Sequence, residues 1–272
     1  MSNARPGTTT PPTRSYGKIR VTEEGPITKI TLFNPERKNA IGPQMVNELL
    51  WALSDAHDDP VTRVIVLTGH GTAFCAGGDF SQMTGGASDG PQLPHKGDYA
   101  DLLLAIVRAE KPIVAAVNGP AMGGGLGLVA ASTFAIAAKG ATLGTPEVNV
   151  GLFPMMIMAV LARLVPRRRL LKMMLLGEKI DADEALAIGL LNEVVAPEEL
   201  EQETKELADD LVGKSPITLK LGLRAFATQD DMTLAESLPM LREKLAECLG
   251  TDDAREGLMA FMQKRKPNWT GK

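Results

Sequence analysis

The chain has 272 residues, and 29 lysines and arginines against 33 aspartates and glutamates give a formal net charge of −4. With 44% hydrophobic residues, this length can fill the core of one large domain, or of a domain with an appendage, without disulfides or metals. The acidic balance gives no general attraction to phosphate backbones, which argues against a nucleic-acid-binding protein. The two cysteines, Cys75 and Cys248, form neither a disulfide scaffold nor a thiolate metal site. Such cysteine usage predicts a reducing, cytoplasmic location.

Neither the first residues of the chain nor its most apolar segment predicts a membrane partner. Residues 1–15 contain several threonines and prolines and no apolar run, so they are predicted to form a disordered tail and not a secretory signal. The most apolar run, residues 155–165, is too short to cross a membrane and contains Arg163. We expect it to form a buried helix, or to place one of its methionines along a ligand pocket.

Strand and helix patterns alternate through the first two thirds of the chain. The predicted strands are 19–21, 27–32, 64–67, 113–117 and 134–138, and the predicted helices between them are 42–57 and 102–107. The strands at 64–67 and 113–117 are apolar throughout, which is typical of strands covered on both faces. This alternation predicts an α/β fold with a mainly parallel sheet and right-handed crossovers.

From residue 181 onward the pattern becomes helical. The predicted helices are 182–187, 198–212, 215–226, 234–249 and 252–263. We therefore divide the chain into a core, residues 16–200, and a C-terminal helical region, residues 201–272. A polar segment rich in glycine and proline, residues 85–98, is predicted to be a mobile surface loop, and loops of that length often cover functional sites.

Two glycine clusters each follow a predicted buried strand. The first covers residues 69–79 and the second residues 118–127. In an open α/β sheet, ligands bind beyond the carboxyl ends of the strands, and glycines there let backbone N–H groups approach a ligand closely. Gly123, Gly124 and Gly125 would open a helix with free amide donors at its positive dipole end. One cluster alone would indicate a tight turn, but two at equivalent positions favour a backbone-lined site for an anion or oxyanion.

Other well-known site types have no support in the sequence. The phosphate-loop pattern GxxxxGK[ST] is absent, and the second cluster does not match GxGxxG. No GxSxG nucleophile elbow occurs, and the three histidines do not form a metal-binding pair. Two amides that converge on a carbonyl oxygen therefore remain the best use of the clusters.

Several blocks of the chain closely resemble the enoyl-CoA hydratase/isomerase (crotonase) superfamily. The blocks are 73–79, 117–125, 145–147 and 151–154, with 34–41 similar to the family's early CoA-contacting segment and 261–267 to its C-terminal ending. The resemblance runs from about Ile19 to Trp269. It implies a crotonase-like core of stacked ββα units and a C-terminal helical region that mediates trimers, often paired into hexamers. It also implies an acyl-CoA thioester as the substrate, with no metal and no cofactor besides the CoA of the substrate.

The resemblance assigns roles to individual residues. The backbone N–H groups of Gly78 and Gly124 would hold the thioester oxygen as it becomes an enolate, and Glu147 would be the catalytic carboxylate. The residues implied in substrate binding are Arg37, Lys38, Ala40, Ala76 and Asp79, together with Phe261 and Lys264 from a neighbouring subunit. By itself, the basic run that contains Lys264 would indicate only a solvated tail.

One departure from the family pattern bears on the reaction. Family hydratases carry a second carboxylate at the position of Gly127, which here has no side chain. A single carboxylate, Glu147, can still move a proton between two carbons of an enolate, so we expect double-bond isomerisation of an enoyl-CoA. Two alternatives stay open. The first is hydration of a 2-enoyl-CoA with Asp79 or a residue of the loop 85–98 as the second acid, and the second is a non-catalytic acyl-CoA-binding protein.

Overall fold

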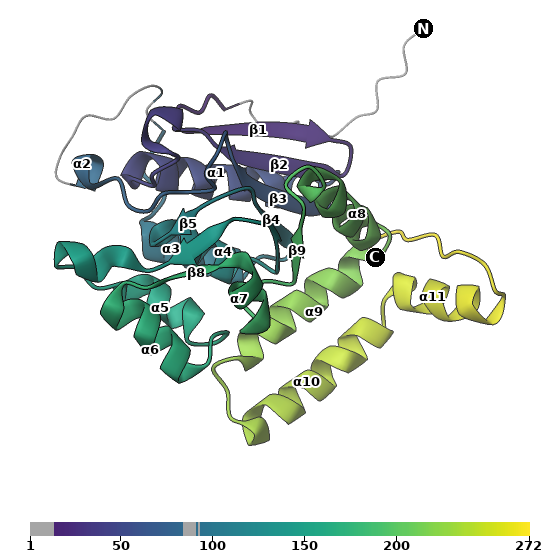
Figure 1. The fold of residues 1–272 in the computed structure, drawn as a ribbon. Coiled ribbons are helices and arrows are strands. Elements are labelled where there is room, and N and C mark those ends of the chain that lie inside the picture. Colours follow the sequence, from purple (N-terminus) through teal and green to yellow (C-terminus); the bar gives the residue numbers. More distant parts are fainter. Residues whose placement is uncertain (1–13, 84–90, 92) are drawn as a thin grey trace, which may run out of the picture.

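The computed structural model describes residues 14–83, 91 and 93–272 (Figure 1). Its main sheet has six strands in the order β1-β2-β3-β4-β6-β9. These strands are β1 (Ile19–Glu24), β2 (Ile27–Leu32), β3 (Val64–Gly69), β4 (Ile113–Val117), β6 (Phe134–Ala138) and β9 (Glu193–Val195). The β1–β2 hairpin is antiparallel, whereas the pairs from β2 to β9 are parallel. The predicted α/β fold with a mainly parallel sheet is confirmed.

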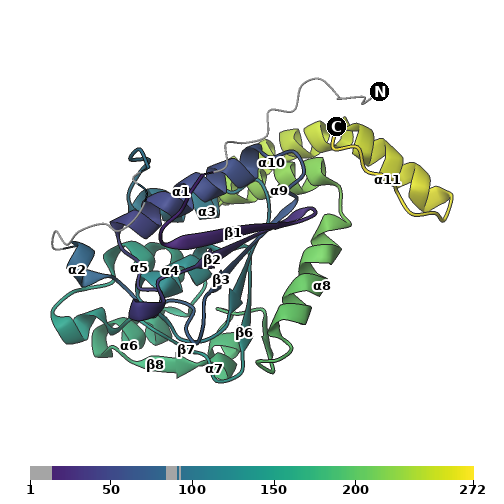
Figure 2. The same ribbon diagram turned by 90° about the horizontal axis from the view of Figure 1, so that it is seen from above.

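Both faces of the central strands are buried, as their continuous apolar sequences predict. On one face, Ile65 and Leu67 of β3 join a large cluster with the helices α1 (Pro43–Asp58), α3 (Tyr99–Val107) and α4 (Gly124–Ala131). On the other face, Val64 and Val66 pack with Ala208 of α8 (Leu200–Val212). Figure 2 shows the sheet between α1 and α8.

A second sheet, of three strands, lies beside the first. It has the order β5-β7-β8, with β5 (Ala121–Met122) parallel to β7 (Thr142–Gly144). The remaining elements of this part are β8 (Lys179–Asp181), the 3₁₀ turns η1 (Pro35–Arg37) and η2 (Pro146–Val150), and the helices α2 (Phe80–Met83), α5 (Met155–Leu161), α6 (Arg167–Leu176) and α7 (Ala182–Ala187). The pairing of β5 with β7 matters most here, because it brings residues just after both strands together.

The last three helices extend away from the sheet (Figures 1 and 2). They are α9 (Pro216–Gln229), α10 (Leu234–Leu249) and α11 (Asp252–Met262). α8, by contrast, packs on β3, β4 and β6. By its contacts α8 therefore goes with the sheet, although the sequence-based division assigned most of it, from residue 201, to the C-terminal helical region.

The expectation of a buried helix at residues 155–165 is wrong for its first turn. The helix α5 ends at Leu161, and only one of its faces reaches the core, through Ile157 and Leu161. Met155 and Met156 are 64% and 49% exposed, because this short helix lies at the edge of the molecule. The helix residues themselves, 155–161, are all apolar, so their composition could not distinguish the buried face from the exposed one.

The predicted tail and loop lie partly outside the described residues. Of the tail, residues 1–13 are outside, whereas Arg14 forms an ion pair with Asp55 at 2.7 Å and lies over the Trp51 ring. Of the loop, residues 85–90 and 92 are outside, and Pro94 accepts hydrogen bonds from Trp51 and Asn47 of α1. Within the described ranges, no helix is long and apolar enough to span a membrane.

Candidate functional site

Two short parallel contacts bring the glycine-rich turns together. Cys75 of the first turn pairs with Ala121 of the second: its N–H donates to Pro120 O at 3.0 Å, and its carbonyl accepts from Met122 N at 2.9 Å. On its other side the first turn pairs with the segment after η1 through a parallel bridge between Ile41 and Gly78. Segments near residues 41, 78 and 121 therefore form three adjacent extended strands, although long stretches of sequence separate them.

The bonds of this bridge set the direction of the Gly78 amide. Ile41 N donates to Gly77 O and Ile41 O accepts from Asp79 N, each at 2.8 Å. Because successive peptide groups of an extended strand point to opposite edges, the N–H of Gly78 points away from Ile41, to the edge that faces the second turn. Across the described residues, no acceptor for this N–H is found.

The Gly124 amide has no acceptor in the described part of the chain, because of its place in a helix. Gly124 is the first residue of α4. The first hydrogen bond of the helix runs from Gly127 N to Gly123 O and does not involve the N–H of Gly124. The first N–H groups of a helix have no partner within it, and they lie at its positive dipole end. Gly123 adopts a positive φ of 49°, a conformation that favours glycine, and this turns the chain from β5 into the helix. The structure thus brings both predicted donors to adjacent segments.

Glu147 lies against this second turn. It sits in η2, shortly after β7, and β7 pairs with β5 so that Met122 lies opposite Gly144. Gly123 N also donates to Gly144 O at 2.9 Å. As a result, Glu147 Oε1 lies 2.7 Å from the point that a β-carbon on Gly123 would occupy. Among the predicted site residues, Glu147 is thus the carboxylate at the turn of Gly124.

The environment of Glu147 disfavours its charged form. Its Oε2 is buried and has no hydrogen-bond partner among the residues described, and the same is true of Oγ1 of Thr145. Burial raises the pKa of Glu147 above its ordinary value, against the opposing effect of a backbone N–H. A carboxyl group with a raised pKa that can bind and release a proton is typical of general acid–base sites.

The place of the missing side chain at Gly127 is filled by other groups. A β-carbon there would collide with the hydroxyl of Tyr99 and lie 2.5 Å from Cγ2 of Ile157. Tyr99 begins α3, and its hydroxyl donates a 2.5 Å hydrogen bond to Gly124 O. Burial, with smaller effects of Cys75 and Glu147, raises the pKa of Tyr99 well above 10, so the phenol stays protonated.

Arg37 and Asp79 of the predicted substrate-binding set contact each other. Arg37 is half exposed, and its NH1 lies 3.0 Å from Oδ1 of the buried Asp79. Asp79 also accepts hydrogen bonds from the side chain and N–H of Ser81, at 2.8 and 3.2 Å, at the start of α2. Burial by itself would raise the pKa of Asp79, but the bonds from Ser81 and Gln82 and the Arg37 charge lower it overall. Asp79 is therefore held as a carboxylate.

The other predicted binding residues fall into two groups. Lys38, Ala40 and Ala76 lie near the first turn, where Ala76 N donates to Lys38 O at 3.0 Å and the Lys38 side chain is exposed. Phe261, at 83% exposure, and Lys264 lie at the end of α11. Both views place α11 far from α4 in the same chain (Figures 1 and 2). The roles of all these residues remain predictions.

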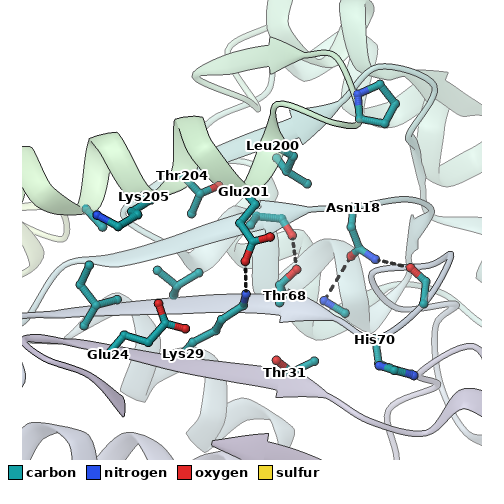
Figure 3. Close-up of a pocket in the computed structure, with 17 residues that line it drawn as sticks. Glu24, Lys29, Thr31, Thr68, His70, Asn118, Leu200, Glu201, Thr204 and Lys205 are labelled. Carbon is teal, nitrogen blue, oxygen red and sulfur yellow. Dashed lines mark hydrogen bonds and ion pairs between the residues drawn. The ribbon is translucent and has the colours of Figure 1, made fainter. Parts of the chain in front are cut away.

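A separate cavity of about 420 Å³ lies between the sheet and α8. Figure 3 shows Lys29 and Glu201 facing each other across it, with a 3.1 Å ion pair, and Asn118 at one end. Gly69 and Gly71 line it, so the first turn contributes its beginning to this cavity, but neither Gly78, Gly124 nor Glu147 is in its lining.

Sequence reasoning missed two residues that build the site. Asn39 is fully buried with a φ of 58°, and its side chain donates to His70 O and Ala73 O, which fixes residues 34–41 against the first turn. Tyr99 was missed because its partner, Gly124, is 25 residues away. A buried asparagine in a loop has a local signal in its tolerance of positive φ, whereas the contact of Tyr99 has none.

Comparisons with known proteins show the family to which the chain belongs. The family profile described as enoyl-CoA hydratase/isomerase matches residues 22–272. A mitochondrial enoyl-CoA hydratase domain-containing protein 3 from Xenopus laevis is 34% identical over 91% of this chain and 84% of its own length. A crotonyl-CoA hydratase from Syntrophomonas wolfei is 32% identical over 95% of this chain and 100% of its own. The crystal structure of an enoyl-CoA hydratase from Polaromonas superposes with a TM-score of 0.86 at 31% identity, covering 93% and 100% of the two chains. The chain belongs to the enoyl-CoA hydratase/isomerase family and is an enzyme of that type.

Proposed function

We propose that this enzyme moves the double bond of an enoyl-CoA thioester from position 3 to position 2. The observation that carries the proposal is the carboxyl group of Glu147 at the turn of Gly124, with a buried oxygen that has no hydrogen-bond partner among the described residues. The free amides of Gly78 and Gly124 would bind the thioester oxygen, with CoA contacts at Arg37 and Lys38. No metal or redox cofactor takes part in this chemistry.

The proton balance needs only one acid–base group. The Glu147 carboxylate takes a proton from C2 of the 3-enoyl thioester, and the electron pair moves through the carbonyl to give a dienolate oxygen. The two amides stabilise that oxygen as its charge develops, and one such donor contributes about 2.7–4 kcal/mol to lowering a barrier. The protonated Glu147 then returns the proton to C4, and the double bond ends between C2 and C3. The raised pKa of Glu147 makes its carboxylate a stronger base for the first of these two proton transfers.

The glycine at position 127, where family hydratases have a second carboxyl group, argues against hydration. Adding water to a double bond by the family's route needs a second carboxyl group to orient the water and supply a proton to carbon. Gly127 supplies none, and its surroundings are filled by Tyr99 and Ile157. Asp79 is a poor substitute, because its bonds to Ser81 and Arg37 keep its pKa low and its carboxyl group ionised.

Hydration of a 2-enoyl-CoA remains the second candidate, because the relatives carry hydratase names. A non-catalytic acyl-CoA-binding protein has less support, because such a protein would have no need of an acid–base group with a raised pKa beside the free amides.

We also propose that the enzyme assembles as a homotrimer or a dimer of trimers, with Phe261 and Lys264 near a neighbour's CoA. The exposed apolar side chains of α10 and α11, among them Leu234 and Met262, support such contacts, and mass measurement in solution tests them.

Two substrates and one variant test the proposed reaction. Purified enzyme given a 3-enoyl-CoA should form the conjugated 2-enoyl-CoA, which is followed by its ultraviolet absorbance. Glu147→Gln should lower this rate by about 10²–10⁴-fold, the usual contribution of general acid–base catalysis. Given a 2-enoyl-CoA, the enzyme should form little 3-hydroxyacyl-CoA. Rapid hydration together with slow isomerisation contradicts the proposal and supports the second candidate.

A further inference from the structure

The helix α4 presents two glycines, one turn apart, to the ring of Tyr99. Ring atoms Cζ and Cε2 lie 3.5 and 3.6 Å from where a β-carbon on Gly124 would be, and the hydroxyl occupies the β-carbon space of Gly127. Residues at positions i and i+3 of a helix lie on the same face, so Gly124 and Gly127 form one shallow groove. The lack of a side chain at Gly127 therefore has a structural role of its own, which is to admit the phenol.

The Tyr99 hydroxyl then restrains the residue whose amide faces the site. Gly124 has neither a side chain nor a helical bond at its N–H, and glycine has the widest backbone freedom of all residues. The 2.5 Å bond from Tyr99 to Gly124 O is a contact from another element that fixes this residue directly. Tyr99 is itself held at the start of α3, where Asp98 caps the helix by accepting from Ala100 N and Asp101 N.

We propose that Tyr99 is a positioning residue, whose hydroxyl bond to Gly124 O, seated in the groove of Gly127, aims the Gly124 amide at the thioester oxygen. This inference rests on the function proposed above and adds a residue to it. The role of Tyr99 is to restrain Gly124, because the protonated phenol donates to a carbonyl and exchanges no proton with the substrate. A donor that is misdirected by about 1 Å can cost up to about 100-fold in rate.

Two variants remove the restraint from opposite sides. Tyr99→Phe deletes the hydroxyl and keeps the ring, and Gly127→Ala puts a methyl group where the hydroxyl sits. Each should lower kcat for isomerisation by about ten- to 100-fold, with KM changed by less than about twofold. Because both break the same bond, the double variant should be no slower than the slower single variant, a non-additivity that independent structural damage does not produce.

The chain offers a matched control for each variant. Tyr16, the other of its two tyrosines, donates its hydroxyl to Asp55 at 3.2 Å, so Tyr16→Phe deletes a comparable bond elsewhere. Gly222 lies in α9, where a β-carbon would meet nothing within 4 Å, so Gly222→Ala tests the generic effect of a methyl group on a helical glycine. Both controls should keep the kcat of the wild type.

A spectroscopic readout separates this inference from the proposed reaction. An acyl-CoA whose acyl group is a conjugated aryl acrylate absorbs at longer wavelength when its carbonyl is polarised by hydrogen bonds. The wild type should shift this absorbance to longer wavelength, and Tyr99→Phe and Gly127→Ala should both reduce the shift. A full shift and unchanged kcat in Tyr99→Phe overturn the inference alone. No shift in the wild type overturns it together with the proposed amide site.

Discussion

The carboxyl group of Glu147 lies directly against Gly123, with Oε1 2.7 Å from the position of an absent β-carbon. This relationship links two parts of the chain that are 24 residues apart, and it exists because β5 and β7 pair in parallel register just before the two residues. It places an acid with a raised pKa beside the first turn of α4. A glycine is needed at residue 123 both for its backbone conformation and for the room it leaves to this acid.

Gly123→Ala should therefore harm both folding and activity. The φ of 49° with ψ of −121° is disfavoured for residues with a β-carbon, and the new methyl group would meet the carboxylate. We expect a loss of about 1–3 kcal/mol in unfolding free energy and a large fall in kcat. Gly25→Ala is the control, because Gly25 also has a positive φ, 61°, but a β-carbon there meets nothing within 4 Å. Equal kcat values in the two variants would contradict the predicted contact.

The pH dependence of the reaction should follow the ionisation of Glu147. Burial raises the pKa of this carboxyl group above 4.5, and the group must be ionised to take the first proton. The rate kcat/KM should fall as pH decreases through this raised pKa, so that the acidic limb lies above pH 4.5. A limb at or below the pKa of an ordinary glutamate would mean that Glu147 is not the base, or that it is well solvated.

The same shift predicts a pH-dependent stability. Since the folded protein binds the Glu147 proton more tightly than the unfolded chain does, this group's contribution to stability is fully present below pH 4.5 and is lost as pH rises through the raised pKa. Glu147→Gln cannot ionise and lacks this loss, so its melting temperature should equal or exceed that of the wild type at neutral pH. A lower melting temperature would indicate that the carboxylate has a stabilising partner in the folded enzyme.

The two cysteines should differ sharply in reactivity. Cys75 is fully buried under α4, and burial raises the pKa of its thiol to about 11, whereas Cys248 is partly exposed. Since the thiolate is the reactive form, a thiol reagent should label Cys248 and spare Cys75 in the folded protein. Labelling of both should require a denaturant. Rapid labelling of Cys75 under native conditions would show that the turn of residues 75–79 opens readily.

The C-terminal end should depend on Asp253 for its anchoring. This carboxylate is 1% exposed and accepts from Ser215 Oγ at 2.7 Å, from Thr270 N at 2.7 Å and from Gly271 N at 3.1 Å. Asp253→Asn should lose about 2–4 kcal/mol in unfolding free energy, because an amide nitrogen cannot accept these bonds. Asp252→Asn is the control, since that neighbour is exposed and forms an ion pair with the exposed Arg255. Thermal or denaturant unfolding measures both, and equal stabilities would contradict the anchoring.

Much of the fold follows from local patterns, but the site does not. The predicted strands at 113–117 and 134–138 coincide with β4 and β6, because a buried strand needs an uninterrupted apolar run. The glycine clusters indicated free amides because the signal is local. The groove that seats Tyr99 and the contact of Glu147 with Gly123 depend on register between distant segments, which no single pattern encodes. The exposed face of α5 escaped prediction for the related reason that its apolar run has no polar side.

A crystal structure with a bound enoyl-CoA, or with an unreactive analogue of it, tests the central claim most directly. The distances from the thioester oxygen to the nitrogens of Gly78 and Gly124 decide the matter. The proposed function predicts that both are hydrogen bonds of about 2.7–3.1 Å, with the Glu147 carboxylate next to C2 and C4 of the acyl chain. A thioester seated elsewhere, for example in the cavity between the sheet and α8, or a Glu147 turned away from the acyl chain, would contradict it.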